Sequence, residues 1–253
     1  MTKSKHYYIR KTHRWLGLLL GIQFILWTVG GLYFSWSDID EVHGDFQKKE
    51  PPLLPSNIAL VSPAVAMQSI SKMHGADSIL SMQLIELLGK PFYQIQCVGA
   101  TGKGFKHEHV KLMNHLADAS TGILRGPLTK EEAAQIATNR FNGDATIKSI
   151  TLLTKVEEDH EYRENPLPAY AVKFDHPTKT TVYVATELGT VQKFRNERWR
   201  IFDFLWMLHT MDYEGRDNFG NILLRIFSVF GLITVLSGFI LYFISAKWTK
   251  RIL

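Results

Sequence analysis

The chain has 253 residues, with 29 lysines and arginines, 24 acidic residues and one cysteine, and nine of the basic residues lie in residues 1–36 and 221–253, which contain no acidic residue. The other 20 basic residues and all 24 acidic residues lie between these ends, which leaves residues 37–220 with a net charge of −4. This asymmetry excludes a nucleic-acid-binding surface as the source of the overall charge of +5 and is typical of a membrane protein with both ends in the cytoplasm.

The first predicted transmembrane helix is residues 15–36, which follow a basic cytoplasmic tail at residues 1–14. The run contains no charged side chain, and at about 1.5 Å per residue it spans roughly 30 Å, the thickness of a bilayer's hydrocarbon core. Trp15 and Trp36 bracket it as interfacial aromatic residues do. A cleaved signal peptide has a shorter apolar run and a small-residue cleavage site, so we expect the helix to be retained.

A linker is predicted over residues 37–58, which are polar and rich in proline. A first unit of mixed structure follows at residues 59–125. It begins with a helix at residues 62–74, where Ser62 suits the N-cap and Pro63 the first helical position. Three alternating segments then predict an antiparallel sheet whose last hairpin closes at a glycine turn.

The second unit, residues 126–196, repeats this order of elements. Thr129 and Glu132 have the spacing of a capping box at the start of its helix. The glycines that close the last hairpins, Gly122 and Gly189, are 67 positions apart. The predicted fold class is therefore α+β, with two transmembrane helices flanking a duplicated unit of one helix and a three-stranded antiparallel sheet.

An interfacial helix and loop are predicted at residues 197–220, before a second transmembrane helix at residues 221–246. Only Arg225 interrupts that apolar run, and its stem can bury while the guanidinium reaches outward. Residues 247–253 form a second basic tail. The positive-inside rule predicts both ends in the cytoplasm and residues 37–220 on the periplasmic side of a bacterial inner membrane.

Small residues predict where the membrane helices pack closely. Gly17 and Gly21 form a GxxxG pattern in the first helix, and Gly231 and Gly238 offer approach points in the second. Such glycines can pack the two helices of one chain and have no other role. They can also support a homo-oligomer.

Motifs at both membrane boundaries resemble the PepSY-associated transmembrane helix family over essentially the whole chain. They are Lys-Thr-His-Arg-Trp-Leu-Gly at residues 11–17, Trp-Met-Leu-His-Thr-Met-Asp at residues 206–212, and the segment at residues 218–225. The two mixed units resemble PepSY modules. Because PepSY modules occur in protease propeptides, the resemblance implies a role in binding another protein. Some members of the family bind b-type haem through membrane histidines and pass electrons across the membrane.

The two units differ at one position of the module pattern. Asp118 precedes the first glycine turn and is expected to cap it. Ala185 stands at the corresponding place in the second unit, so that role cannot be filled there.

Two of the ten histidines, His13 and His209, lie at membrane boundaries and are candidate ligands of haem b. His13 shares a helix face with Gly17 and Gly21, which would leave room for a flat macrocycle beside an axial nitrogen. His209 ends the predicted interfacial helix. The two lie on opposite sides of the membrane, so they are not ligands of the same haem. The alternative is that both fix helix orientation through hydrogen bonds.

Other residues predict no catalytic or metal site. No nucleophile elbow, zinc-protease, CxxC or Walker pattern is present, and His107 and His109 lack a third ligand in the sequence. We therefore expect an accessory or partner-binding membrane subunit, with a haem-bearing electron-transfer component as the alternative and an enzyme in its own right as the weakest hypothesis. The expected partners are the lipid bilayer and either a second copy or another membrane or periplasmic protein.

Overall fold

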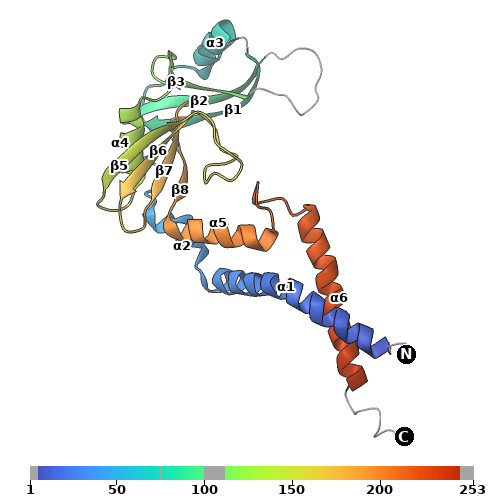
Figure 1. The fold of residues 1–253 in the computed structure, drawn as a ribbon. Helices are drawn as coiled ribbons and strands as arrows, with labels where there is room; N and C mark the ends of the chain where they lie inside the picture. The colour runs from blue at the N-terminus through green and yellow to red at the C-terminus, as the bar shows by residue number, and fades with distance from the viewer. Residues whose placement is uncertain (1–4, 75, 100–111, 246–253) are drawn as a thin grey trace. The chain divides into compact units, whose positions relative to one another are not determined.

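The computed structural model describes residues 5–74, 76–99 and 112–245, which form two compact units (Figure 1). The helical unit comprises Met1–Asp38 and Arg200–Leu253, and the sheet unit comprises Ile39–Trp199. The fold is α+β, as predicted, with two antiparallel sheets and helices before, between and after them in the sequence.

The helical unit contains two helices that are long and apolar enough to cross a membrane. They are α1 (Lys5–Trp36), with a candidate span at Tyr7–Trp36, and α6 (Ile222–Ser245), with a candidate span at Ile222–Ile244. Only 17% and 11% of the apolar windows in these spans are buried within the chain. The core helix of a soluble protein would be mostly covered, so this exposure favours helices that face lipid.

Helix α1 begins earlier than predicted. The sequence placed its start at Trp15, after a tail, whereas the helix starts at Lys5. No glycine or proline lies between Lys5 and Arg14 to interrupt it, and lysine and arginine have high helix propensity. The basic residues therefore continue the same helix.

The described residues of the range 59–125, in the first half of the sheet unit, form one helix and four strands. They are α3 (Pro63–His74), β1 (Ala76–Leu87), β2 (Lys90–Gly99), β3 (Leu112–Asp118) and β4 (Leu124–Arg125), with antiparallel order β1-β2-β3-β4. The expected three-stranded sheet was wrong by one strand. The added strand is β4, which pairs with β3 through Leu116↔Arg125 and Ala117↔Leu124.

The second half also contains one helix and four strands. They are α4 (Lys130–Arg140), β5 (Thr146–Leu153), β6 (Ala169–Asp175), β7 (Thr181–Ala185) and β8 (Val191–Arg195), in the order β5-β6-β7-β8. Here too the chain forms a further strand after the glycine turn. Helix α4 starts with the predicted capping box: the Thr129 hydroxyl accepts from the Glu132 N–H, and the Glu132 carboxylate accepts from the Thr129 N–H.

The two glycine turns have the same backbone bond with different side chains. The Gly122 N–H donates to the carbonyl of Asp118 at 2.7 Å, and the Gly189 N–H donates to that of Ala185 at 3.0 Å. Asp118 Oδ1 also accepts from the N–H groups of Ser120 and Thr121. The carboxylate therefore reinforces the first turn, whereas Ala185 has no side-chain acceptor to do so in the second.

The segment expected to be a linker contains local structure. A short helix α2 (Ile39–His43) is followed by a 3₁₀ turn η1 (Asp45–Gln47). Gln47 is 1% exposed, and its amide exchanges hydrogen bonds of 2.6 Å with Thr178 and Thr180 beside β7. These bonds hold the start of the segment against the second half of the sheet unit.

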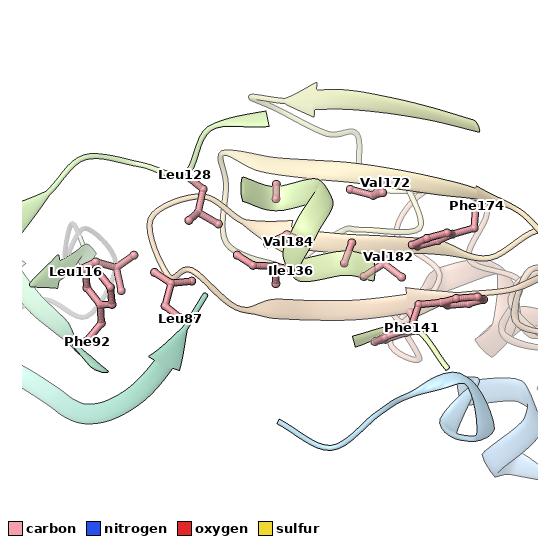
Figure 2. Packing of buried hydrophobic residues seen from close by; sticks show 13 residues of the cluster. Leu87, Phe92, Leu116, Leu128, Ile136, Phe141, Val172, Phe174, Val182 and Val184 are labelled. Carbon is pink, nitrogen blue, oxygen red and sulfur yellow. The ribbon is translucent and has the colours of Figure 1, made fainter. Parts of the chain in front are cut away.

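The largest apolar core joins the two halves of the sheet unit (Figure 2). Leu87, Phe92 and Leu116 come from the first sheet and belong to the same buried cluster as Val182 and Val184 of the second. A buried hydrogen bond of 2.5 Å, from the Gln94 amide to the Leu188 carbonyl, also links the halves. Burial of this much apolar surface is the dominant favourable term in folding.

The opposite face of the first sheet is covered by α3. Ala66 and Ile70 of this helix are buried in a smaller cluster with Tyr93, Ile95 and Cys97 of β2. Desolvation in this cluster raises the pKa of the Cys97 thiol. The cysteine therefore behaves as a packing residue rather than as a thiolate.

Candidate functional site

His13 connects the two membrane helices. Its Nδ1 lies 2.8 Å from the Ser237 hydroxyl on α6, and that hydroxyl donates its own proton to the Thr234 carbonyl at 2.8 Å. Because a hydroxyl has one proton to donate, Nδ1 of His13 must be the donor to Ser237. The neutral ring is then protonated at Nδ1 and carries its lone pair on Nε2.

Two of the four predicted packing glycines lie against α1. A Cβ at Gly238 would come within 3.2 Å of the His13 ring, and one at Gly231 within 3.3 Å of the Phe24 ring. A Cβ at Gly17 or Gly21 would meet no atom within 4 Å. Gly231 and Gly238 therefore leave room for side chains of α1, whereas Gly17 and Gly21 lie on an open face of α1.

His209 is at the end of α5 (Glu197–Thr210), enclosed by aromatic residues of α1. Its ring centroid lies 5.9 Å from that of Trp27 and 5.9 Å from that of Phe34. Both His209 Nδ1 and Trp27 Nε1 are shielded from solvent and have no hydrogen-bond partner among the described residues. Unpaired polar atoms in an apolar setting are costly, so this pair is an exception within the packed region.

Further contacts hold α5 against α1. Gln23, only 7% exposed, donates from its amide to the Leu208 carbonyl at 2.7 Å. The Phe34 ring packs at 4.7 Å from that of Phe202 and 5.9 Å from that of Trp206. The position of His209 is therefore fixed by its neighbours on the same helix.

The loop from α5 to α6 is built around two polar side chains. Asp212 is 8% exposed, and its carboxylate accepts hydrogen bonds from the N–H groups of Gly215 and Asn218. Asn221 donates to the Thr210 carbonyl at 3.0 Å and accepts from the Leu224 N–H at 2.8 Å, which caps α6. These bonds set the direction in which α6 leaves the loop.

The structure does not bring His13 and His209 together. Trp27, which lies against His209, is fourteen positions beyond His13 on the continuous helix α1. At about 1.5 Å per residue that separation is roughly 21 Å. The two histidines therefore belong to different levels of the helical unit.

The sheet unit has a second candidate region along its edge strand β1. Four large apolar side chains there are 40–60% exposed: Ile79, Leu80, Met82 and Leu84. Beside the C-terminal part of β1 lies a groove of about 570 Å³, bounded by residues 83–88, residues 51–54, the end of α4 and Gly189–Val191. Two charged side chains lie on its wall, Glu86 and Arg140.

Over residues 10–252 the chain matches the family described as PepSY-associated TM region. The protein belongs to this family. No match to the chain was found among curated proteins or among solved structures. As a PepSY-associated membrane protein with two candidate spans, it places the helical unit in contact with the lipid bilayer.

Residues of both membrane-boundary motifs make hydrogen bonds within the helical unit. In this PepSY-associated protein, His13 of the first motif binds Ser237, and Asp212 of the second organises the loop before α6. The described residues include no group of three or more histidine, cysteine or acidic side chains placed to hold a metal ion. His107 and His109 lie outside the described residues.

Three residues of these regions were not found from the sequence. Gln23 and Trp27 lie inside an apolar run, where a glutamine in a membrane helix was the available signal, since polar residues there usually face a partner. Arg140 is a basic residue in the last turn of a helix, a common position. Its place on the groove depends on packing and has no local signal.

Proposed function

We propose that this protein is a bacterial inner-membrane subunit that presents two PepSY modules, residues 59–125 and 126–196, to the periplasm and binds a protein partner there. Both ends lie in the cytoplasm in this proposal. The basic ends and the acidic middle support the topology. The repeated order of one helix and four strands supports a duplication.

The observation that carries the proposal is the apolar edge strand β1. Edge strands present unpaired backbone groups, and proteins usually protect them with charges, prolines or short length. Here β1 is twelve residues long and exposes Leu80 by 60% and Leu84 by 41%. Such a surface is typical of a strand that is covered by a partner.

Site-specific photocrosslinking in cells tests this function. A benzophenone side chain at Leu80 should give a discrete adduct with one periplasmic or membrane protein, identified by mass spectrometry. The matched control is Leu152, which is 49% exposed on β5, the edge strand of the second sheet. Equal adducts at both positions, or none at Leu80, would contradict a binding role for β1.

The hydrogen bond between His13 and Ser237 supports a second candidate function, electron transfer through haem b. Histidines that bind a metal usually donate their other ring N–H to a fixed acceptor, and Ser237 fills that role for Nδ1. The open face at Gly17 and Gly21 would accommodate a flat macrocycle. His209 fits less well as an axial ligand, because its Nδ1 has no partner among the described residues.

The absorption spectrum of the protein purified in detergent from haem-replete cells tests this candidate. Haem would supply one-electron redox chemistry, and its Soret band should be lost in His13→Ala and kept in His209→Ala. An axial pair at the His13 level would need a histidine from a second copy or a partner. The absence of a Soret band from the purified protein would contradict the electron-transfer function, provided that both variants fold normally.

A further inference from the structure

The groove beside β1 runs along the edge of the strand. Five consecutive residues of β1, 83–87, contribute to its wall together with Leu88 of the following turn, although neighbouring side chains of a strand point to opposite faces. A run without gaps means that the groove follows the backbone edge rather than one face of the sheet. Since β1 is the outermost strand of its sheet, alternate residues direct unpaired N–H and C=O groups toward this space.

The far wall of the groove leaves the edge of β1 unpaired. It includes Pro51 and Pro52, which have no N–H group to donate, and no backbone hydrogen bond or strand pairing joins residues 51–54 to β1 in the described chain. Leu53 on the rim is 92% exposed. An extended segment lying between the walls would pair with β1 and cover this leucine.

Arg140 provides a charged contact on the same groove. Its Nε atom is shielded from solvent and has no hydrogen-bond partner among the described residues. Among the described residues, no carboxylate forms an ion pair with Arg140 within 4 Å. Glu50 is near enough to attract the guanidinium electrostatically. An N–H group that is shielded from solvent and has no partner costs free energy, and a carboxylate is the ligand that best satisfies a guanidinium.

We propose that this edge groove binds an extended apolar segment of a partner protein as an added strand on β1, with an Asp or Glu side chain of that segment on Arg140. The inference rests on the partner-binding function. A side-chain carboxylate fits better than a chain terminus because terminal carboxylates are captured by backbone N–H groups. Arg140 is instead the last residue of α4, where a helix presents carbonyl groups.

The test uses the full chain in detergent and an array of end-blocked octapeptides. Valine and threonine alternate in each peptide, and one glutamate is moved through all positions. Fluorescence anisotropy should find one register that binds at least about tenfold more tightly than the same peptide with glutamine, as expected for a hydrogen bond to a charged group. The amide I band of the ¹³C-labelled peptide should move into the β-sheet range on binding.

Variants of the protein separate the Arg140 contact from general charge. Arg140→Gln should remove the preference for glutamate, whereas Lys130→Gln should keep it. Lys130 is exposed at the other end of α4. Its substitution therefore removes one positive charge from the same helix without touching the groove. Leu84→Lys changes a half-exposed side chain of the groove and should weaken every peptide. Circular dichroism and thermal unfolding show that each variant is folded.

Several results would overturn the edge groove as a binding site. They are the absence of any binding peptide, equal binding of glutamate and glutamine peptides, an equal effect of Lys130→Gln, or tighter binding of peptides that carry a free terminal carboxylate. If these occur while the adduct at Leu80 persists, the partner-binding function stands and the groove assignment fails. If peptides bind but no adduct forms in cells, the function fails instead.

Discussion

His13 and Ser237 join the two membrane helices by one hydrogen bond of 2.8 Å, although 224 positions separate them in the sequence. Bonds of this kind between membrane helices contribute about 0.6 kcal/mol on average and up to about 1.7 kcal/mol. The bond also fixes the tautomer of His13, so its loss affects both the packing of α1 on α6 and the chemistry of the ring.

Ser237→Ala should lower the free energy of unfolding by about 0.6–1.7 kcal/mol, because it leaves Nδ1 of His13 without an acceptor. Unfolding in mixed micelles, followed by circular dichroism, measures the loss. Ser228→Ala is the control, since among the described residues the Ser228 hydroxyl bonds the Leu224 carbonyl of its own helix and no group of α1. Equal effects of the two substitutions would show that the interhelical bond adds nothing.

Gly238→Val should destabilise the contact between α1 and α6. Even a Cβ at this position lies 3.2 Å from the His13 ring, and Ser237 holds that ring in place. Overpacking of this kind costs about 1–3 kcal/mol. Gly17→Val, where a Cβ meets no atom within 4 Å, should change the same unfolding measurement by less than about 0.5 kcal/mol.

Gly189→Ala should destabilise the sheet unit by about 1–3 kcal/mol. The residue has φ +70°, which favours glycine, and a Cβ would lie 3.0 Å from Leu116 of the first sheet. Thermal unfolding of the full chain measures the change. Gly126→Ala is the control, because that glycine has open space and no positive φ. A neutral Gly189→Ala would contradict the close approach of the two halves.

Glu132 should give α4 a pH-dependent contribution to stability. Burial acts to raise the pKa of this carboxyl, but its bonds to Arg125 and to the Thr129 N–H outweigh burial and lower it. Because the pKa is lowered in the folded state, the ionised carboxylate stabilises the protein at pH values above the ordinary glutamate pKa of about 4.3. This stabilisation is lost as the pH falls through the folded-state pKa.

Glu132→Gln should therefore cost about 1 kcal/mol at neutral pH and progressively less as the solution becomes acidic. Denaturant unfolding at several pH values measures the difference from the unchanged protein. Glu131→Gln, on the exposed side of the same helical turn, should show a smaller and flatter difference. A gap that widens toward acid pH would reverse the assigned direction of the shift.

Local signals were sufficient to predict α3 and α4 of the sheet unit. Thr129 and Glu132 cap α4 through atoms three positions apart, and Pro63 begins α3. Such contacts depend on spacing along the chain, which the sequence displays directly. The same holds for the apolar runs of α1 and α6, whose length alone indicates a bilayer span.

Contacts between distant segments escaped prediction. Strand β4 has two residues, too few to show a strand period, and it exists because Leu124 can pair with Ala117. Gln47 lies in a polar segment that reads as a linker, yet it binds Thr178, 131 positions away. The groove and its Arg140 depend on four separate segments, so no single window of sequence contains them.

The core shared by Leu87, Phe92 and Leu116 with the second sheet makes the two similar halves thermodynamically inseparable. A cut between Gly126 and Thr129 would give each fragment a complete set of strands and an uncovered apolar face. Neither piece should then remain monomeric and folded. The sheet unit should unfold in a single cooperative transition. A ligand bound at the edge of one half therefore also stabilises the other half against unfolding.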